Sequence, residues 1–467
     1  MRHLLLLSII LTALLSKEVL FKDGSRYDGE LRYGKMYGSG KLTFPDGSVY
    51  SGSFKNGRQH GRGVFLFANG DRYEGEFREG RFEGKGVFVK HRSYRFEGLF
   101  VAGKKTGLGK MKYTNGQTYD GEFVENRIEG IGVMVYADGS TYTGPFKNGL
   151  REGYGSLLLA TGARYTGEFK SDLFEGKGEI LYSNGDRYSG SFKAGKREGS
   201  GSLVYSYGDR YEGMFKNDAF DGKGVFRYII GDTYEGTFRV GQKSGMGLFS
   251  YADGSLYEGP FANDRFHGKG HLSYANGNVY EGEFKEGLRD GKGIYTFADG
   301  TVYEGSFKEG LYDGSGHFTY ANGDAYSGTF IKGQKSGEGE YRYHTDDLYA
   351  GKLKEDGFGP EGVLTVHNGD RYEGGFADSK KEGQGTYRFS NGDLYEGSYS
   401  EGYKSGLGIY KSAEGAVYEG AFAEGKKNGQ GKFVDRDGQV LEGIFSGDKY
   451  RYKKGWSLSS VAPTATD

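Results

Sequence analysis

The sequence repeats with a 23-residue period, and its register never slips. A tyrosine two residues before a glycine occurs at Tyr27, Tyr50 and Tyr73 and continues in this register to Tyr418, with Phe96 as the single replacement. This spacing defines eighteen repeats over residues 27–440. A fixed period of roughly 20 to 50 residues indicates a repeat architecture, in which each motif packs mainly against its neighbours. The chain is therefore expected to form a linear array of one small motif.

Glycine has fixed places in each repeat, which we number from the tyrosine as position 0. It stands at +2 and +13 in all eighteen repeats, at +11 in seventeen and at +20 in sixteen. Together with the glycines at +7, these positions hold 81 of the 88 glycines. Collagen would need glycine at every third residue, and disordered glycine-rich chains lack the 40 tyrosines and 33 phenylalanines present here. The composition therefore indicates an ordered β-rich array.

Residues 50–72 show how one repeat is expected to fold. Tyr50, Gly52 and Phe54 alternate with polar residues, which is the pattern of a strand with one apolar face. A second alternating run follows, and an Asn-Gly pair after each run predicts a turn. Each repeat is thus predicted to be a β-hairpin. The array is then an all-β, elongated, single-layer antiparallel meander with an aromatic face and a polar face of Glu, Ser, Lys and Arg.

The glycine positions carry their own predictions. We expect glycines at +2, +11 and +13 to make room for aromatic rings that lie flat over the backbone. Position +7 is expected to need a positive φ angle, because its replacements are mostly residues that tolerate a left-handed backbone. These replacements are Asn126, Asp172, Asp218, Asp264, Asp356 and Ser379.

The N-terminal residues depart from the repeat. Residues 1–16 begin with positive charge and contain an apolar run of twelve, which is typical of a secretory signal peptide, although Leu14 and Ser16 make a poor cleavage site. The alternative is a mis-assigned start, because residues 19–24 resemble the second strand and turn of a preceding hairpin. Residues 17–26 are accordingly interpreted as a partial repeat.

The C-terminal residues 441–467 are interpreted as a partial repeat followed by a tail. Leu441 to Phe445 opens a nineteenth repeat that lacks its partner strand. The basic and aromatic stretch 449–456 either caps this last strand or anchors a partner or an anionic lipid. An unpaired strand with aromatic neighbours tends to pair, so we expect a homodimer through the C-terminal repeats, with a capped monomer as the alternative.

The pattern Y-x-G-x-F-x-x-G-x-x-x-G-x-G resembles the MORN repeat, over residues 27–445. This resemblance implies a single-layer β-meander with a groove lined by the aromatic positions. Repeat 96–118 opens on phenylalanine after a turn without glycine. Repeat 349–371 has Leu353 for the aromatic residue and Pro360 for a glycine. We expect kinks at these two repeats.

The aromatic face is the feature with functional content. Its rings either form a thin core or line a binding groove, since a single-layer sheet has no second layer to cover them, and exposed apolar patches mark binding sites. An apolar helix could lie in such a groove. The candidate groove residues are Tyr50, Phe54, Tyr73, Phe77, Tyr119, Phe123, Tyr188, Phe192, Tyr211, Phe215, Tyr280, Phe284, Tyr303, Phe307, Tyr418 and Phe422.

Other chemistry is not indicated. Residues 236–244, 328–336 and 397–405 resemble phosphate-binding loops, but the periodicity generates all three and the lysine is misplaced. His267 and His271 would lie about 13 Å apart on a strand, too far for one zinc ion. The chain has no cysteine, and no catalytic constellation or cofactor motif stands out. The resemblance implies that enzymes of this family carry a separate catalytic domain beside the repeats. The residues before and after the repeats in this sequence are too few for such a domain.

The predicted function is therefore a non-enzymatic scaffold or tether that binds proteins along the aromatic groove. The alternative is a peripheral membrane protein that binds phospholipid head groups, a role that the resemblance also implies. Nucleic acid is disfavoured because 62 basic residues balance 63 acidic ones. The compartment depends on residues 1–16: secretory or membrane-associated if they form a signal, otherwise cytoplasmic or cytoskeletal.

Overall fold

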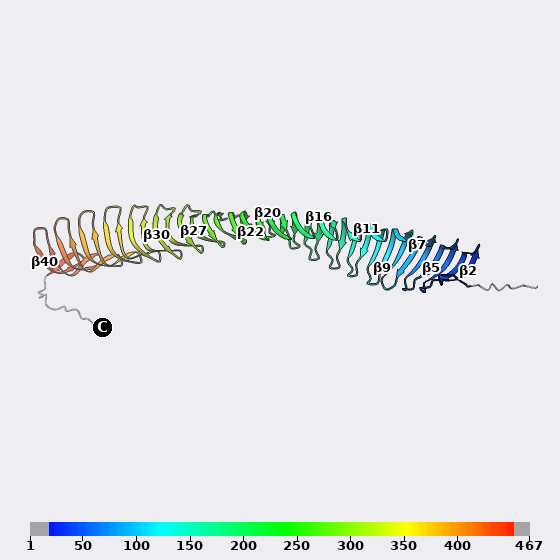
Figure 1. Cartoon of the computed structure of the whole chain (residues 1–467). Helices are drawn as coiled ribbons and strands as arrows, with labels where there is room; N and C mark the ends of the chain where they lie inside the picture. Colours follow the sequence, from blue (N-terminus) through cyan, green and yellow to red (C-terminus); the bar gives the residue numbers. More distant parts are fainter. Residues whose placement is uncertain (1–17, 453–467) are drawn as a thin grey trace, which may run out of the picture. The chain divides into compact units, whose positions relative to one another are not determined.

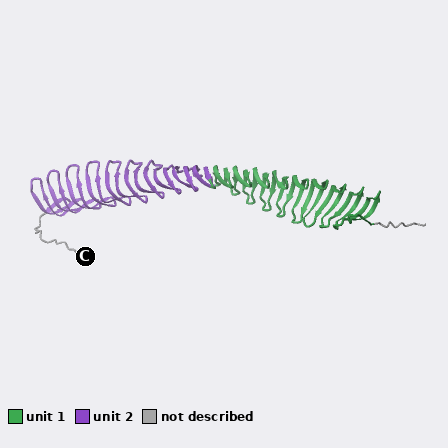
Figure 2. Cartoon of the chain, in the orientation of Figure 1, with its two compact units in different colours: residues 1–229, 239–241 green, residues 230–238, 242–467 purple. Residues whose placement is uncertain are grey.

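The computed structural model describes residues 18–452 (Figure 1). These residues form 41 β-strands and contain no helix, so no described helix could span a membrane. The chain divides into two compact units (Figure 2). Unit 1 comprises residues 1–229 and 239–241, and unit 2 comprises residues 230–238 and 242–467. The predicted signal peptide at residues 1–16 lies outside the described residues.

Unit 1 contains the first twenty strands. They are β1 Val19–Leu20, β2 Arg26–Arg32, β3 Lys35–Thr43, β4 Val49–Lys55, β5 Arg58–Leu66, β6 Arg72–Arg78, β7 Arg81–Lys90, β8 Tyr94–Val101, β9 Lys104–Tyr113, β10 Thr118–Val124, β11 Arg127–Val135, β12 Thr141–Lys147, β13 Leu150–Arg151, β14 Gly153–Leu158, β15 Arg164–Lys170, β16 Leu173–Leu181, β17 Arg187–Lys193, β18 Lys196–Val204, β19 Arg210–Lys216 and β20 Ala219–Arg227.

The remaining strands belong to unit 2, apart from the last residue of β21. They are β21 Thr233–Arg239, β22 Gln242–Ser250, β23 Leu256–Ala262, β24 Arg265–Phe266, β25 Gly268–Ser273, β26 Val279–Lys285, β27 Leu288–Thr296, β28 Val302–Lys308, β29 Leu311–Thr319, β30 Ala325–Ile331, β31 Gln334–Arg342, β32 Leu348–Lys354, β33 Gly357–Thr365, β34 Arg371–Ala377, β35 Lys380–Arg388, β36 Leu394–Ser400, β37 Tyr403–Lys411, β38 Val417–Ala423, β39 Lys426–Val434, β40 Val440–Ser446 and β41 Lys449–Tyr452.

Within each unit, successive strands pair in antiparallel fashion in chain order. In the second repeat the two strands of the hairpin, β4 and β5, place Tyr50 opposite Phe65. The next repeat then adds β6 to β5, with Gly63 opposite Gly75. Pairing that involves only neighbours in the chain is what a short, regular sequence repeat predicts. The all-β, single-layer antiparallel meander of hairpins is therefore confirmed.

Every hairpin closes with a two-residue turn at positions +6 and +7. Lys55 pairs with Arg58, so only Asn56 and Gly57 form the loop, and their φ angles are 52° and 79°. Two successive positive φ angles define the type I′ turn, whose twist matches that of paired strands. The six residues that replace glycine at +7 also have positive φ, as predicted. The positive φ at +6 was not predicted, and it extends even to the β-branched Val240.

The glycine at +11 has a different role from the one predicted. In the second repeat, the pairing of β4 with β5 shifts register between Gly52 and Phe54, which is a β-bulge, and Gly61 opposite it has a φ of 68°. A Cβ on Gly61 would point to Ser53 on the polar face and would meet no aromatic ring. The prediction that position +11 receives rings was therefore wrong. Glycine is needed there because the bulge requires a left-handed residue.

Two hairpins have an interrupted second strand. Pro145 and Pro260 occupy position +3, where proline has no N–H to donate across the hairpin. The second strand breaks opposite them, at Glu152 and His267, whose N–H groups donate to the proline carbonyls at 3.1 and 3.0 Å. These breaks, together with β1, β40 and β41 outside the eighteen repeats, bring the number of described strands to 41.

The two irregular repeats do not interrupt the sheet. Around Phe96, strands β7 and β8 pair without a register shift. In repeat 349–371, Leu353 takes the place of the phenylalanine and is buried. Pairing of β33 with β34 begins only at Gly362, because Pro360 cannot donate a backbone hydrogen bond. Here the irregular sequence produces a shortened strand ladder.

The partial repeats at both ends also form strands. β1 pairs with β2, as the second strand of a preceding hairpin would. At the other end, β41 pairs with β40. Residues 441–445 therefore have a partner strand, contrary to the prediction that this half-repeat lacks one. Gly447 and Asp448, with φ angles of 59° and 68°, form the same two-residue turn as the complete repeats.

Polar side chains connect many repeats to the next at the two edges of the sheet. At one edge, the residue at +21 accepts from the N–H at +18 of the next repeat, as Asp186 does from Ser206 at 2.8 Å. At the other edge, an acid at +10 accepts from the N–H at +6 of the next repeat, as Glu175 does from Ala194 at 2.9 Å. These bonds satisfy turn N–H groups that no strand pairs.

Candidate functional site: the aromatic face

Each tyrosine at position 0 lies flat over two glycines of its own hairpin. A Cβ on Gly52 or Gly63 would lie 2.4 to 2.6 Å from the Tyr50 hydroxyl. That hydroxyl donates to the carbonyl of Ser53 at 2.9 Å. Burial raises the pKa of Tyr50 to about 12, so the phenol stays protonated and donates at neutral pH. The prediction that glycines at +2 and +13 make room for rings is confirmed, although the ring comes from the same hairpin.

The aromatic residue at +4 packs against this tyrosine from two sides. Tyr50 meets Phe54 of its own repeat at a centroid distance of 5.0 Å and Phe77 of the next repeat at 4.8 Å, both edge-on. Tyr188 makes the same two contacts with Phe192 and Phe215, at 5.1 and 5.0 Å. Edge-on geometry is favourable because the positive ring edge meets the negative ring face. These contacts tie each repeat to the next.

The sixteen predicted groove residues are consequently buried by the chain itself. All of them are between 0 and 5% exposed. Within each unit the structure brings them together on one face, where they form the core of the sheet. That they bind a partner stays a prediction, and any partner would first meet the side chains that lie over them.

Position +9 covers the tyrosine ring, and its residue type alternates from one repeat to the next. Phe174 stacks on Tyr165 with centroids 3.8 Å apart, whereas Arg197 in the next repeat places its guanidinium 5.6 Å from the Tyr188 centroid. From the third repeat to the sixteenth, apolar and basic residues take turns, which doubles the period of this position. The apolar members are Phe82, Ile128, Phe174, Phe220, Phe266, Tyr312 and Phe358, and the basic ones are Lys105, Arg151, Arg197, Lys243, Arg289, Lys335 and Lys381.

The turn of the following repeat holds several of these basic side chains. Nη2 of Arg197 donates to the Asp218 carbonyl at 2.6 Å, and the Asp218 carboxylate accepts from the Arg197 backbone N–H at 2.9 Å. Arg151 and Asp172 repeat this arrangement, with their side chains 3.0 Å apart. All four aspartates at +7 follow a repeat with a basic residue at +9, and aspartate still tolerates the left-handed turn.

Lys105 is the one fully buried base among them. It is 7% exposed, and its Nζ donates to the Tyr94 hydroxyl at 2.7 Å. Burial, together with the smaller effect of the nearby Lys90 charge, lowers the pKa of Lys105 to about 8. Its aliphatic stem and ammonium group cover Phe96, the ring that replaces tyrosine in this repeat.

A row of half-buried aromatic side chains lies beside this core, at position +17. The rings lie at a tilt beside those at +15, as Tyr251 does beside Phe249 at 4.6 Å and Tyr343 beside Tyr341 at 4.7 Å. Because they remain partly exposed, they contribute to the accessible aromatic surface of this face, together with half-buried rings at +9 such as Phe82 and Phe174. The tyrosine row, as we call it, consists of Phe44, Phe67, Tyr113, Tyr136, Tyr182, Tyr205, Tyr228, Tyr251, Tyr274, Phe297, Tyr320, Tyr343 and Phe389.

In unit 1 the tyrosine row borders a hollow of about 670 Å³. Its walls contain Tyr182 and Tyr205 from the row, Asn184, and the paired Arg197 and Asp218. Burial raises the pKa of both tyrosines, so they are neutral hydrogen-bonding groups. The hollow thus offers aromatic surface and neutral polar groups beside a compensated ion pair, a combination suited to peptide side chains.

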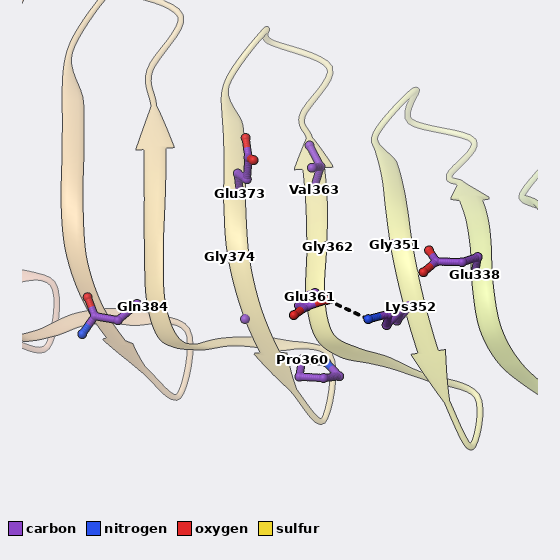
Figure 3. A pocket seen from close by; sticks show the side chains of 11 residues that line it. Glu338, Gly351, Lys352, Pro360, Glu361, Gly362, Val363, Glu373, Gly374 and Gln384 are labelled. Carbon is purple, nitrogen blue, oxygen red and sulfur yellow. Dashed lines mark hydrogen bonds and ion pairs between the residues drawn. The ribbon is translucent and has the colours of Figure 1, made fainter.

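The opposite face is hollowed where glycines lie in a row. Figure 3 shows Gly351, Gly362 and Gly374 on neighbouring strands, near the ion pair of Lys352 with Glu361, whose charged atoms are 2.8 Å apart. This hollow measures about 470 Å³. Both charged side chains are more than half exposed, so their pairing contributes little to stability.

The remaining sequence motifs lie on strands and turns. Segments 328–336 and 397–405 belong to the hairpins β30–β31 and β36–β37, and strands, not a helix, follow them. His267 and His271 are both exposed. Within residues 18–452, no three histidine, aspartate or glutamate side chains gather closely enough to hold a metal ion.

Sequence reasoning missed the residues at +9 and the separate role of +17. The basic residues at +9 were given no role, because a lysine or arginine on a strand is usually solvated. Strand pairing places them opposite the residue at +4, on the aromatic face, where their stems cover rings. The signal that reveals them is the doubled period, which appears when repeats are compared in pairs.

Solved structures resemble the chain only weakly. The TCP domain of Drosophila melanogaster SAS-4 (dCPAP), in complex with a proline-rich motif of Ana2 (dSTIL), is 16% identical with a TM-score of 0.22, over 33% of this chain and 86% of that one. The TCP10 domain of Danio rerio CPAP in complex with a STIL peptide is 11% identical with a TM-score of 0.15, over 68% and 96%. Virginiamycin B lyase from Staphylococcus aureus is 11% identical with a TM-score of 0.11, over 69% and 98%. No function is inferred from them.

The family comparison is decisive. No curated protein matches the sequence significantly. The MORN repeat, however, matches seventeen segments between residues 27 and 440. The matches leave out residues 348–371, the repeat with Leu353 and Pro360, which nevertheless forms the hairpin β32–β33. Together the matched segments cover most of the chain, which belongs to the MORN-repeat family.

Proposed function

We propose that this protein is a non-enzymatic scaffold that binds other proteins along its aromatic face. The observation that carries the proposal is the tyrosine row, which within each unit is a line of partly exposed rings beside the core. MORN repeats typically interact with proteins or lipids. Tyrosine offers a large amphipathic contact surface at a low cost in side-chain entropy, which suits it to protein interfaces.

The geometry of the repeat supports several contacts with one partner. Equivalent rings in successive repeats are two strands apart, about 9.6 Å at the usual strand spacing. A partner helix or extended segment that follows the row would therefore meet one ring per repeat, in keeping with the predicted apolar helix in a groove. Each contact adds to the others without a new type of site.

The charges beside the row favour proteins over lipid head groups. Arg151 and Arg197 are held by Asp172 and Asp218, so they present little free positive charge. Head-group binding draws on uncompensated lysine and arginine near a membrane surface. Phospholipid binding remains the alternative, and it predicts binding to anionic vesicles that weakens as salt is raised.

A comparison of matched variants tests the proposal. Tyr251, Tyr274 and Tyr320 are changed together to serine, and a control changes Leu288, Leu311 and Ile331, which are about half exposed away from the row, to serine. Affinity capture from native cells, followed by mass spectrometry, is expected to recover partners with the wild type and the control but not with the tyrosine variant. Equal recovery with all three proteins would refute the role of the row.

Vesicles and light scattering address the other expectations. Co-sedimentation with anionic vesicles is measured at two salt concentrations. Binding that is lost with the tyrosine variant would favour the lipid alternative. The predicted homodimer through the C-terminal repeats is tested by light scattering on the full chain and on a chain ending at Val440. A full-length monomer at tens of micromolar would exclude it.

A further inference from the structure

One stretch of the polar face in unit 1 is apolar. Position +12 is serine, lysine, arginine, glutamate or glutamine in thirteen repeats, but Leu108, Ile131 and Tyr154 occupy it in three consecutive ones. These side chains are 69, 65 and 67% exposed. The other two apolar residues at +12, Met246 and Leu407, each stand between repeats with a polar residue there.

Strand pairing aligns these side chains across the sheet. Leu108 lies on β9, Ile131 on β11 opposite Pro145 of β12, and Tyr154 on β14. Leu99 on β8, which is also exposed, extends the line on the same face. We call Leu99, Leu108, Ile131 and Tyr154 the apolar row. Next to Tyr154 the same face is hollowed, over a volume of about 530 Å³.

Folding does not account for the apolar row. Each of the three side chains at position +12 precedes the glycine at +13 that receives the tyrosine ring on the opposite face, and that packing is the same whatever stands at +12. Exposing large apolar side chains to water does not stabilise a fold. Contiguous groups of such side chains mark interaction surfaces. The row is therefore a second surface, separate from the tyrosine row.

We propose that the apolar row binds an amphipathic helix of a partner protein, laid across the strands. Leu108, Ile131 and Tyr154 follow one another at about 9.6 Å, because each repeat adds two strands. An α-helix advances about 10.5 Å in seven residues. A helix with one apolar residue in every seven therefore presents an apolar side chain to each member of the row.

Charge defines the flank of that helix. Lys104, Arg127 and Lys147 lie on the same face along one long side of the apolar row. Lys104 is paired with Glu125 at 3.0 Å, whereas Arg127 and Lys147 make no ion pair within the described residues. A helix whose flank carries glutamate or aspartate would complement these two charges.

A second copy of this chain suits the surface less well. Glu122 on β10 stands in the row, between Leu108 and Ile131, and its carboxylate accepts from the backbone N–H of Ile131 on the neighbouring strand β11 at 3.4 Å. A two-fold contact centred on the row would bring the Glu122 carboxylates of both copies into a dry interface. Like charges without water between them are strongly unfavourable. A partner helix carries no second Glu122, so this repulsion between like charges does not arise.

Fluorescence anisotropy with a labelled synthetic helix tests the proposal on the full-length protein. The probe spans about five helical turns, or about 18 residues at 3.6 per turn, with leucine at every seventh position and glutamate along one flank. A triple variant changes Leu108, Ile131 and Tyr154 to serine. We expect it to weaken binding at least tenfold, which corresponds to about 1.4 kcal/mol. The control variant, Met246→Ser with Leu407→Ser, is expected to bind as the wild type does.

Further variants and probes separate the proposal from its alternatives. All substituted residues are exposed, so the variants should melt with the wild type, and a probe with lysine in place of glutamate should bind several-fold more weakly. The tyrosine variant of the aromatic face should retain full binding, which separates this site from the proposed function. Equal affinity of the triple variant, or no binding up to about 1 mM probe, would overturn the proposal. Self-association that only the triple variant loses would overturn it in favour of a second copy.

Discussion

Ile131 and Gly132 are neighbours on β11, yet they face opposite requirements. Gly132 points to the aromatic face, where a Cβ would lie 2.4 Å from the Tyr119 ring. Ile131 points to the polar face and is 65% exposed. The aromatic face has glycine at this position in all eighteen repeats, whereas the polar face varies from lysine to leucine. What every repeat shares is what folding needs, and what differs between repeats is free to serve binding.

The largest expected effect separates these two neighbours directly. Gly132→Val must displace the Tyr119 ring and break its hydroxyl bond to the Glu122 carbonyl, so we expect a loss of about 3 kcal/mol in unfolding free energy. Ile131→Ser should change it by less than about 0.5 kcal/mol. Urea unfolding followed by circular dichroism measures both. Similar losses in the two variants would remove the distinction between the faces.

A second pair lies on β16. Phe174 stacks on Tyr165, and we expect Phe174→Ala to cost about 2 kcal/mol, because it uncovers the tyrosine and leaves a cavity. Lys177 on the polar face only donates to the Ser191 hydroxyl, so Lys177→Ala should cost about 0.5 kcal/mol or less. Thermal melts of both variants against the wild type make the comparison. A larger loss for Lys177→Ala would contradict it.

The sequence predicts the face with uniform requirements far better than the other. Four features could be predicted: the tyrosine at 0, the glycines at +2 and +13, and the turn at +7. At each of these positions one residue type recurs, or is replaced by a residue that can adopt the same conformation. The left-handed backbone at +6 could not, since Asn56, Glu79 and Val240 share no chemical property there. The turn geometry of the paired strands forces that conformation on them.

Two other features depend on the bulge or on neighbours in space. The bulge turns +11 towards the polar face, so the role of the glycine there was missed, and the role of Lys105 at +9 was not predicted. The apolar row could not be predicted because a full repeat separates Leu108 from Ile131 in the sequence. Only strand pairing shows that they share a surface. The sixteen candidate groove residues share one face within each unit but are buried there, and that this face binds a partner stays a prediction.

Lys105 offers a smaller test, based on pH. Its pKa is about 8 in the folded chain and 10.5 in the unfolded one, so the folded state carries the cost of a buried charge at pH 7. Stability should therefore rise as the pH increases from about 8 towards 10. Lys105→Met removes that cost, and we expect its melting temperature at pH 7 to exceed the wild-type value by about 3 °C.

The Lys105→Met comparison has a built-in control. The advantage of the variant should shrink between pH 7 and pH 9.5, because the wild-type lysine loses its proton in the folded state over this range. Ile128→Met, at the same position of the next repeat, contains no titrating group and should show a difference from the wild type that does not vary with pH. A constant difference for Lys105→Met would mean that its ammonium group is not buried.

The smallest effect is expected at the edge where the two faces meet. Asp172→Gly restores the commonest turn residue at +7, so the backbone gains freedom to adopt its left-handed conformation. The same change removes the carboxylate that accepts from the Arg151 backbone N–H and pairs with its side chain. The lost hydrogen bond and ion pair together contribute about 1 kcal/mol, of which the easier turn offsets part. We therefore expect a net loss of about 0.5 kcal/mol in unfolding free energy. We expect almost no loss when Arg151→Phe is introduced as well, because phenylalanine at +9 covers the ring in the next repeat without an acid.

A double-mutant cycle by urea unfolding measures this coupling. Additive losses would show that aspartate at +7 and the base at +9 alternate independently of each other.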